Sequence, residues 1–356
     1  MASEKLSLPT PDRLLELIDA MAGQPVVMLA DLVADRFIRG VPARISREAP
    51  VLILSYDGET LTPGGGANAV FNVAALGGRP LPIGIVGDDA SGDELRRIFA
   101  AHDIPLDGIV TRPGFRTPTK TRIVAGPRHG IKQQIVRYDV EDTAELSEAE
   151  LLGRLEQLRG AAGGARVAVL SDYGYGAVDP RLVPGIRRTL GSEVTILGDS
   201  RYRLGELSGL DGVTPNSEEA MALLGRPFEG DRAEIENGGR ELLDRLACRF
   251  LLITRGSAGM SLFAAEPGPE SGLAHLPVHG TSQVADVTGA GDTVIGTFAL
   301  ALAAGGRPLE AACLANYAGG VVVMKMGTAT LGPDELRVAV TSDPQLLQGI
   351  HRTAWR

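Results

Sequence analysis

The chain has 356 residues, 44% of them hydrophobic and 22% charged, which suits one large α/β domain or two small domains. Its formal net charge of −9 disfavours a general binder of nucleic acid or anionic membrane, because both need a basic surface. Cys248 and Cys313 are too few for a disulfide framework. The start of the chain is polar, without a signal peptide, and the first apolar run is too short to span a membrane. We therefore expect a cytoplasmic protein with a small-molecule partner, and neither nucleic acid nor membrane.

Short apolar runs follow one another along the chain, and each is continuous rather than alternating with polar residues. Strands buried on both faces of a parallel sheet have this pattern. Between the runs lie segments with helical periodicity, and Ser91 with Glu94 and Ser147 with Glu150 have the spacing of capping boxes. The alternation predicts an α/β fold, a doubly wound and mostly parallel sheet with helices on both faces. Strands are expected at 26–30, 81–86, 167–170, 194–197 and 250–253, and helices at 91–102, 151–158, 216–224, 233–246 and 293–304.

Two stretches, 36–60 and 115–138, interrupt this alternation, because they lack a long helical period and contain β-branched residues and turn signals. Each is predicted to form a short antiparallel strand pair outside the main sheet. Together the two pairs could form one small β layer that covers a site, and we call this layer the lid. The α/β core would then comprise residues 1–35, 61–114 and 139–356.

The most informative motif is Asp-Val-Thr-Gly-Ala-Gly-Asp at 286–292, followed by an apolar helical segment. Its glycines let the backbone approach a ligand closely, and a helix that starts there directs free N–H groups and its positive dipole end at that ligand. Such a turn suits the charge on a phosphoryl group in transfer. Asp292 could accept a proton from the attacking hydroxyl, with Gly289, Ala290 and Gly291 as the catalytic turn. Taken alone, the motif is also explained by a glycine turn whose Asp caps the helix.

A second motif, Pro-Gly-Gly-Gly-Ala-Asn at 63–68, precedes another helical segment. Gly64 and Gly65 would let backbone N–H groups reach sugar hydroxyls, and Asn68 supplies both a donor and an acceptor. A flexible loop with a capping Asn is the alternative. Asp35 follows the first strand, where open α/β sheets place ligands, whereas we interpret Asp31 as a solvated loop residue.

Two further motifs point to a nucleotide. Asn216 and Glu219 are one helical turn apart, so both could hold phosphate and hydrated Mg²⁺, although an N-cap Asn with an exposed Glu fits equally well. After the strand at 250–253, hydroxyls and backbone amides could meet ATP phosphates, unless the segment is an ordinary strand and turn. The residues concerned are Thr254, Arg255, Gly256 and Gly259.

Taken in order, the motifs extend over residues 26–335, and their joint appearance is far more specific than any one of them. Residues 286–292 resemble the C-terminal signature of the ribokinase-like (PfkB) carbohydrate kinases, and residues 63–68 resemble their N-terminal glycine-rich signature. The resemblance implies an ATP-dependent sugar kinase that uses Mg²⁺ and forms a homodimer through its lid. It further implies that Asp35 grips two sugar hydroxyls, that Asn316 lies beside adenine, and that the region of Asp286 holds a monovalent cation such as K⁺.

Within this family the sequence is most similar to the branch that phosphorylates a heptose 7-phosphate at its anomeric hydroxyl, which gives a heptose 1,7-bisphosphate. The similar segments are 35–37, 44–50, 132–137, 171–174 and 287–294, and they place Asp172 among the substrate-binding residues. A 7-phosphate needs a cationic clamp, because Arg and Lys pair with phosphate oxygens. For each candidate, an exposed strand residue that only keeps a sheet edge soluble is the alternative. The candidates are Arg44, Arg122, Lys132 and Arg137.

The sequence departs from the family pattern at three places. Ala30 replaces the usual Gly before Asp31, Gly66 replaces an Ala of the glycine-rich stretch, and Arg201 stands where a Lys is expected. Two other classes of protein stay open as alternatives. One is a non-catalytic sugar or nucleotide sensor on the same fold. The other is a Rossmann-type dehydrogenase, although no Gly-x-Gly-x-x-Gly follows the first strand.

Overall fold

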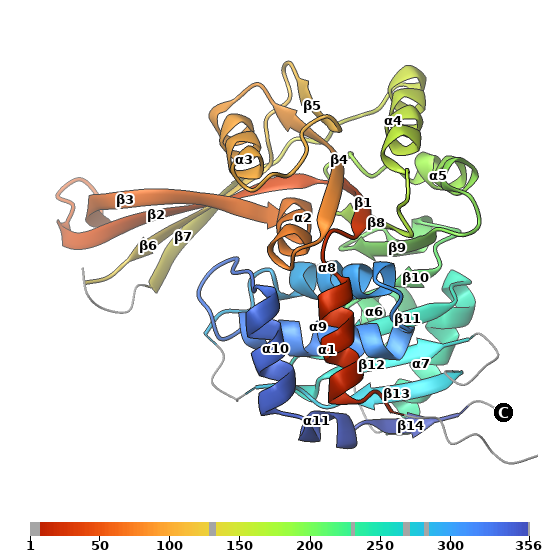
Figure 1. Ribbon diagram of the computed structural model, residues 1–356. Coiled ribbons are helices and arrows are strands. Elements are labelled where there is room, and N and C mark those ends of the chain that lie inside the picture. The colour runs from red at the N-terminus through yellow and green to blue at the C-terminus, as the bar shows by residue number, and fades with distance from the viewer. Residues whose placement is uncertain (1–7, 128–132, 229–231, 266–270, 281–284, 355–356) are drawn as a thin grey trace, which may run out of the picture.

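The computed structural model describes residues 8–127, 133–228, 232–265, 271–280 and 285–354. These residues form a large sheet with helices on both faces, and a smaller sheet that extends away from it (Figure 1). The strands of the large sheet are β1 Pro25–Ala30, β4 Arg79–Gly87, β5 Ile109–Arg112, β8 Val167–Asp172, β9 Thr195–Ser200, β10 Gly212–Val213, β11 Phe250–Thr254, β12 Met260–Ala264, β13 Gly272–Leu276 and β14 His351–Thr353. Their order is β14-β13-β12-β11-β10-β9-β8-β1-β4-β5. Neighbours from β5 to β11 pair in parallel, and those from β11 to β14 pair antiparallel.

The apolar runs are continuous because both faces of the sheet are covered. Val26 and Met28 of β1 pack in one hydrophobic cluster, and Val27 and Leu29 pack in the other. Successive side chains of a strand point to opposite faces, so each cluster takes every second residue. The first cluster includes residues of α1 Pro11–Ala20, α2 Gly66–Ala75, α3 Ala90–Ala101, α8 Ala290–Ala303, α9 Pro308–Val322, α10 Pro333–Ser342 and α11 Gln345–Gln348. The second includes residues of α4 Glu148–Ala161, α5 Val183–Leu190, α6 Ser217–Leu224 and α7 Arg232–Leu246, and short 3-10 helices lie at Pro180–Leu182, Leu204–Glu206 and Gly256–Ala258.

The two predicted capping boxes have different outcomes. Ser147 and Glu150 form the reciprocal hydrogen bonds at the start of α4, as predicted. The prediction for Ser91 is wrong, because α3 begins one residue earlier and Asp89 is its N-cap. The Asp89 carboxylate accepts the N–H of Gly92 at 2.8 Å and that of Thr117 at 2.7 Å, so it also ties the helix to a distant loop.

The lid is one four-stranded sheet in the order β3-β2-β6-β7. Its strands are β2 Leu32–Ile45, β3 Leu52–Gly65, β6 Thr119–Ala125 and β7 Gln133–Val140. The hairpins β2–β3 and β6–β7 are antiparallel, and β2 joins them by pairing in parallel with β6. The β2–β3 hairpin extends beyond the predicted segment 36–60, because its pairing continues from the lid into both motif regions, with Asp35 opposite Thr62 and Leu32 opposite Gly65.

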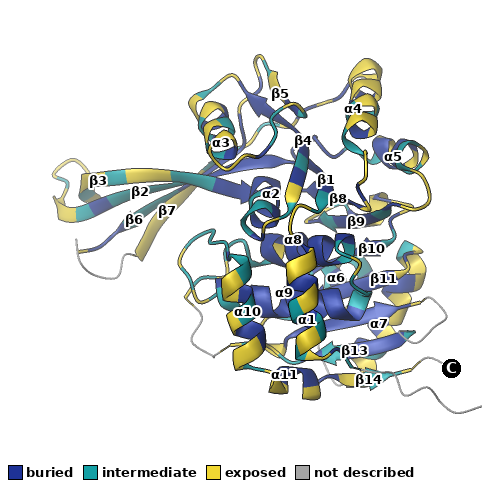
Figure 2. Cartoon of the chain, viewed as in Figure 1, coloured by how far each residue is buried: buried dark blue, intermediate teal, exposed yellow. Residues whose placement is uncertain are grey.

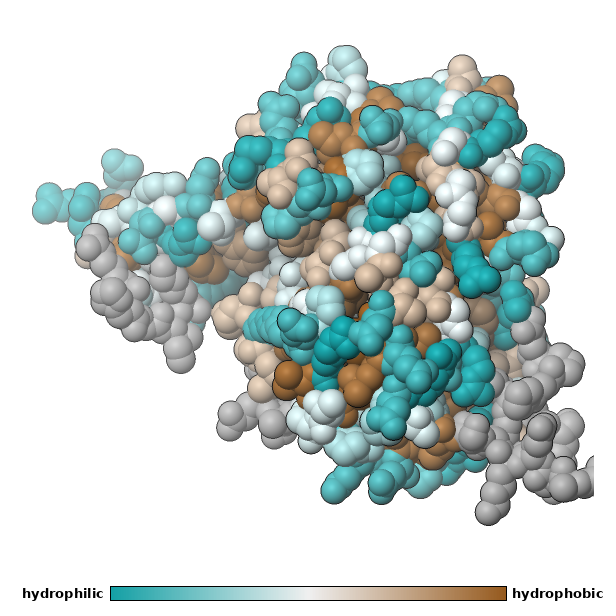
Figure 3. Space-filling view, in the orientation of Figure 1, coloured by the Kyte–Doolittle hydropathy of each residue, from teal (hydrophilic) through white to brown (hydrophobic). Residues whose placement is uncertain are grey.

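Burial differs sharply between the two sheets (Figure 2). The strands of the large sheet are mostly buried, whereas the outer part of the lid is exposed. The face shown in Figure 3 mixes hydrophilic and hydrophobic side chains. Within the described ranges, the helices are too short or too polar to cross a membrane.

Candidate active site

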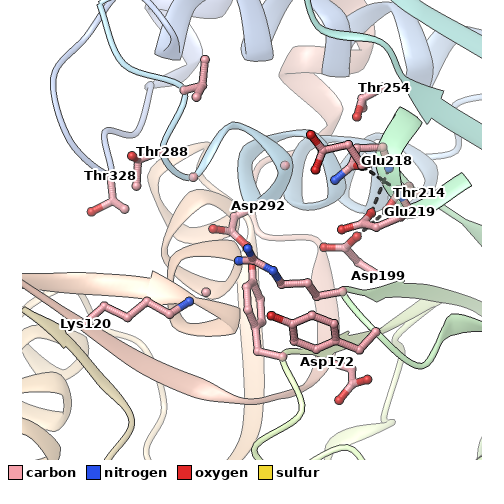
Figure 4. A pocket seen from close by; sticks show the side chains of 18 of the residues that line it. Lys120, Asp172, Asp199, Thr214, Glu218, Glu219, Thr254, Thr288, Asp292 and Thr328 are labelled. Atoms are coloured by element: carbon pink, nitrogen blue, oxygen red, sulfur yellow. Dashed lines mark hydrogen bonds between the residues drawn. The ribbon is translucent and has the colours of Figure 1, made fainter. Parts of the chain in front are cut away.

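A cavity of about 730 Å³ lies where the lid meets the large sheet and the start of α8. This is the size of cavity that takes a small ligand. In Figure 4, Asp292 stands between Lys120 on the lid side and Asp199 and Glu219 on the other side. The cavity brings together eleven residues predicted from the sequence: Asp35, Gly65, Arg122, Arg137, Asp172, Asn216, Glu219, Thr254, Gly289, Gly291 and Asp292.

Asp292 is placed by the glycine turn at the start of α8. Gly289 is the N-cap with φ +78°, a conformation that favours glycine, and a Cβ there would lie 2.5 Å from Nδ2 of Asn68. Gly291 lines the cavity, and a Cβ there would meet no heavy atom within 4 Å. The N-terminal turn of α8, with Ala290 as its first residue, therefore opens on the cavity, where unpaired N–H groups of a helix attract anions.

The Asp292 carboxylate is 3% exposed, and each of its oxygens accepts one hydrogen bond. Asn68 donates from Nδ2 to Oδ2 at 2.9 Å, and the Tyr173 hydroxyl donates to Oδ1 at 2.6 Å. Burial raises the pKa of Asp292 from 3.8 to about 7, against the effect of these two donors. A carboxylate with a pKa near neutrality is well suited to accept a proton as a general base.

A chain of buried amides fixes the orientation of Asn68. Asn72, one turn later on α2, donates from Nδ2 to Oδ1 of Asn68 at 3.1 Å, and Thr293 donates to Oδ1 of Asn72 at 3.0 Å. Nδ2 of Asn68 therefore faces Asp292. The sequence interpretation gave Asn68 to the sugar hydroxyls, whereas the structure gives it to the carboxylate. Asn72 was missed, although its spacing of four residues from Asn68 was a usable signal.

The acceptor side of the cavity contains Asp35 at the base of the lid. Arg122 on the neighbouring strand β6 pairs with it, with 2.5 Å between Nη1 and Oδ1. Gly64 gives this carboxylate room, because a Cβ there would lie 2.5 Å from Oδ2 of Asp35. Asp172 also lines the cavity, but its carboxylate pairs with Arg203 and accepts hydrogen bonds from Ser200 and Gly174.

The predicted phosphate clamp is only partly assembled. Arg122 and Arg137 line the cavity, but they pair with Asp35 and Asp139. Arg44 is exposed near the far end of β2, away from the cavity, and Lys132 lies outside the described residues. Lys120 and Arg201 line the cavity instead, and among the described residues neither has an ion-pair partner within 4 Å.

The Lys120 side chain, which sequence reasoning missed, lies against the face of Tyr173. Its Nζ is 5.0 Å from the ring centroid, and the residue is 9% exposed. Burial lowers the pKa of this lysine, while the nearby Asp35 carboxylate opposes that effect. Lys120 comes from β6 within the predicted lid, where its position on a cavity-facing strand could not be read from a single sequence.

At the nucleotide side, Asn216 and Glu219 line the cavity and form a reciprocal capping box at the start of α6. The Glu219 N–H donates to Asn216 Oδ1 and the Asn216 N–H donates to Glu219 Oε2, both at 2.9 Å. The predicted cap and the predicted cavity position are thus both present. Burial raises the pKa of Glu219, and burial together with the Glu219 charge raises that of Asp199 well above its usual range.

Of the four residues predicted at the end of β11 and in the turn after it, Thr254 lines the cavity, and Arg255, Gly256 and Gly259 do not. Gly256 and Gly259 shape the turn with φ of +52° and +79°, and a Cβ on Gly259 would lie 2.0 Å from the Leu276 carbonyl oxygen. Arg255 donates to the Ser261 hydroxyl at 3.4 Å.

Asn316 and Asp286 are not among the residues that line the cavity. Asn316 is 2% exposed and donates to the Pro277 carbonyl at 2.7 Å, as a buried polar helix residue does. The Asp286 carboxylate accepts hydrogen bonds from the Thr288 N–H and hydroxyl and from the Gly327 N–H. These three bonds order the loop before α8.

The interpretation of Asp31 as a solvated residue is wrong. This side chain is 1% exposed and accepts three backbone N–H groups, from Tyr173 at 2.8 Å, Tyr175 at 2.9 Å and Ala177 at 2.8 Å. The loop after β8 folds over the end of β1, which local sequence does not show. Cavity residues that sequence reasoning left without a role are Lys120, Tyr173, Asp199, Arg201, Tyr202, Thr214, Glu218, Ala222, Val287, Thr288 and Thr328.

Comparison with known families gives a clear result. Residues 39–174 and 179–335 match the model of the pfkB family carbohydrate kinases. The chain belongs to this family. The enzyme class predicted from the sequence, a carbohydrate kinase, is thereby confirmed, and the match takes in the lid from residue 39 onward, both glycine motifs and Asp292.

Among curated relatives, the "Bifunctional protein HldE" of Mesorhizobium japonicum is 39% identical over 337 residues, which cover 93% of this chain and 65% of the relative. The protein of the same name from Paramagnetospirillum magneticum is 38% identical over 334 residues, with 92% and 65% coverage. The chain thus spans about two thirds of the length of these relatives.

Solved structures confirm the ribokinase-like fold. Phosphofructokinase-2 from Escherichia coli in complex with substrates and products superposes with a TM-score of 0.71 at 20% identity, covering 90% of this chain and 99% of that one. Arabidopsis thaliana ribokinase complexed with ribose and ATP gives 0.70 at 20% identity with the same coverage. At this identity the similarity shows the fold alone.

Proposed function

We propose that this kinase transfers the γ-phosphoryl group of ATP to a sugar hydroxyl, with Asp292 as the general base. The observation that carries the proposal is one buried carboxylate with a pKa of about 7, at the open N-terminus of α8 and in a 730 Å³ cavity. That combination supplies a proton acceptor and an anion site side by side.

The proposed step is an in-line displacement. The hydroxyl oxygen of the acceptor bonds to the γ-phosphorus while Asp292 accepts the hydroxyl proton. The bond from that phosphorus to the bridging oxygen of ADP breaks. The N–H groups at the start of α8, next to Gly289 and Gly291, would face the transferring phosphoryl group. Because such transition states gain little from covalent help, position and electrostatics should dominate the rate.

The residues present fit Mg²⁺ at the nucleotide side. Asp199 and Glu219 bring two carboxylates into one buried region; burial raises the pKa of both, and the Glu219 charge raises that of Asp199 further. Mg²⁺ commonly takes one or two carboxylates together with substrate phosphates and water, and it would neutralise phosphate charge. Among described residues there is no cluster of three or more His, Cys, Asp or Glu placed for a metal, which agrees with a site completed by the nucleotide.

A monovalent cation near Asp286 stays a prediction. A neighbouring fold, Escherichia coli phosphofructokinase-2, has been solved in complex with potassium. In this chain the Asp286 carboxylate already accepts three hydrogen bonds from its own loop.

For the acceptor we propose a sugar phosphate, and specifically a heptose 7-phosphate phosphorylated at its anomeric hydroxyl. The resemblance of the chain to heptose 7-phosphate kinases motivates the choice, and the charge of the cavity supports it. Within the part of the chain that the structure describes, Lys120 and Arg201 have no ion-pair partner, and Arg122 and Arg137 lie on the lid strands beside Lys120. A neutral sugar would give Lys120 and Arg201 no charged partner in a partly buried cavity, whereas a phosphate would pair with them.

The test is a coupled ADP-release screen with heptose 7-phosphate, hexoses, hexose phosphates, ribose and nucleosides as acceptors. We expect turnover with a phosphorylated sugar, and a loss of about 10²- to 10⁴-fold in Asp292→Asn because the base is removed. Near-normal turnover in Asp292→Asn refutes the assigned base. Binding of sugar or ATP without ADP release by the unmodified protein would favour the sensor alternative.

Lys120→Met tests the substrate class. Loss of one charge-assisted contact should raise KM for the phosphorylated acceptor by roughly 10- to 100-fold, with little change for a neutral sugar. Arg44→Ala is the matched control, because this cation lies on the same lid but outside the cavity. Activity confined to neutral sugars, or equal effects of the two variants, would contradict the sugar phosphate.

We also propose that the enzyme is a cytoplasmic homodimer that associates through its lids. ATP is available in the cytoplasm, and the free lid exposes large apolar side chains that a second lid could cover. Val136 and Tyr138 on β7, on the opposite face from Arg137, are 47% and 48% exposed.

A further inference from the structure

Tyr173 is the described residue nearest to the reacting carboxylate that neither the sequence motifs nor the proposed chemistry assigns. Its hydroxyl donates to Oδ1 of Asp292 at 2.6 Å, while Asn68 donates to Oδ2. An ionised carboxylate oxygen has two lone pairs, so each oxygen of Asp292 keeps one free for the acceptor hydroxyl. Tyr173 can therefore stay bonded during proton transfer.

The Tyr173 ring is held from three directions. The backbone N–H of Tyr173 donates to the buried Asp31 carboxylate at 2.8 Å, and this bond fixes the loop after β8 to the end of β1. The ring packs against Gly65, where φ is +50° and a Cβ would lie 3.2 Å from two ring atoms. On the lid side the Lys120 ammonium lies 5.0 Å from the ring centroid. A side chain held by the core, the glycine-rich motif and the lid together has little rotational freedom.

We propose that Tyr173 is the positioning residue of the base: it holds the Asp292 carboxylate toward the cavity and keeps it ionised at neutral pH. This inference rests on the proposed kinase reaction. The phenol is a suitable partner because burial, and then the Asp292 charge, raises the pKa of Tyr173, so it remains a proton donor at every pH of interest. A hydrogen bond to the charged form of an acid favours that form.

Other charged groups around Asp292 act in both directions. Asp35 from β2 raises its pKa and Lys120 from β6 lowers it, while Asp199 from β9 is itself affected by the Asp292 charge. Burial dominates all of them and favours the neutral acid, which cannot take a proton. Against burial, the hydroxyl of Tyr173 is the largest effect that keeps the base ionised.

Tyr173→Phe isolates this hydroxyl, since the ring and its packing remain. The acid limb of the kcat–pH profile should move upward by about one to two pH units, the equivalent of one charge-assisted hydrogen bond. At pH 7 the turnover should fall about tenfold or more, with partial recovery at pH 9. KM for ATP should change little. A role in folding alone would lower turnover at every pH without moving the limb.

Tyr175→Phe is the matched control, because it removes a phenol from the same loop. The Tyr175 hydroxyl donates to Glu141 at 2.9 Å and lies outside the cavity lining, so its removal should leave the acid limb in place. An unmoved limb in Tyr173→Phe, or an equal movement in both variants, overturns the inference.

A readout without turnover separates this inference from the proposed function. In urea unfolding, the stability of Tyr173→Phe should go on falling with rising pH to a higher pH than that of the unmodified protein, because the pKa of folded Asp292 has risen further. If the unmodified protein phosphorylates no acceptor, the proposed function fails. The unfolding curves would still decide whether Tyr173 governs the ionisation of Asp292, and coincident curves for the two proteins would refute it.

Discussion

The buried base should destabilise the protein that carries it, and Asp292→Asn measures by how much. The substitution keeps the side-chain shape. The new amide can accept from Asn68 with its oxygen and donate to the Tyr173 hydroxyl with its nitrogen, so both hydrogen bonds survive. What disappears is the ionisation of a carboxyl whose pKa rises from 3.8 to about 7 on folding.

The sign and size follow from proton linkage. Because the folded protein holds this proton more tightly than the unfolded chain, stability is complete below about pH 4 and falls as the pH rises to about 7. The difference between 3.8 and about 7, at 1.36 kcal/mol for each pH unit, gives about 4 kcal/mol as an upper bound. Asp292→Asn loses this dependence, so at pH 8 it should be the more stable protein by up to about 4 kcal/mol.

The assay is urea unfolding of both proteins at pH 5 and pH 8, without nucleotide or sugar. The free-energy difference between Asp292→Asn and the unmodified protein should be clearly larger at pH 8. Asp107→Asn, at an exposed position, serves as the control and should show no such change. An equal difference at both pH values, or a less stable Asp292→Asn at pH 8, would show that water in the cavity already solvates the carboxylate.

Three further predictions concern packing, the loop and the lid. Gly66→Ala should cost about 1–3 kcal/mol in urea unfolding, because its Cβ would lie 2.7 Å from the Asp31 carbonyl oxygen and 2.8 Å from the Ala30 Cβ. Adding Ala30→Gly removes the second contact and should recover part of the loss, and additive effects would disprove the coupling. Asp31→Asn should cost about 1–3 kcal/mol by the same assay and lower turnover, because its amide nitrogen would face a backbone N–H; an unchanged unfolding midpoint contradicts this. The double variant Val136→Lys/Tyr138→Glu should sediment as a monomer while the unmodified protein sediments as a dimer, and a monomeric unmodified protein would refute the lid interface.

The parallel core was predictable because its signal is local. Each buried strand is a short apolar run, and β1 shows why: Val26 and Val27 enter opposite hydrophobic clusters, so polar residues are excluded from both faces. The glycine turn before Asp292 was readable only together with its flanking residues, since Gly-Ala-Gly-Asp alone also fits an ordinary turn with a capping Asp. The lid was predicted as two strand pairs, but the parallel pairing of β2 with β6 depends on which hairpins meet.

The hydrogen bonds and ion pairs of the site were not predictable, because they depend on contacts between distant segments. Asp31 and Asp35 are similar in sequence, four residues apart on the same side of the first strand. The structure buries Asp31 under a loop that arrives from residues 173–177, and it pairs Asp35 with Arg122. Which acid is structural and which faces the ligand is decided by a loop more than a hundred residues away.

Ala30 and Gly66 are two departures from the family pattern that concern one contact in the structure. Read along the sequence, each weakens the similarity at a motif: a methyl group appears at the end of β1 and another disappears from the start of α2. In the structure the two positions touch, since a Cβ on Gly66 would lie 2.8 Å from the Ala30 Cβ and 2.7 Å from the Asp31 carbonyl oxygen. The Ala30 methyl group therefore occupies part of the space that a methyl group at position 66 would need, and the Asp31 backbone limits the rest. The exchange is therefore a matter of packing and says nothing about the acceptor. Arg201 differs, because it faces the cavity and keeps the positive charge of the expected lysine, so the choice of substrate should depend on cations such as this one.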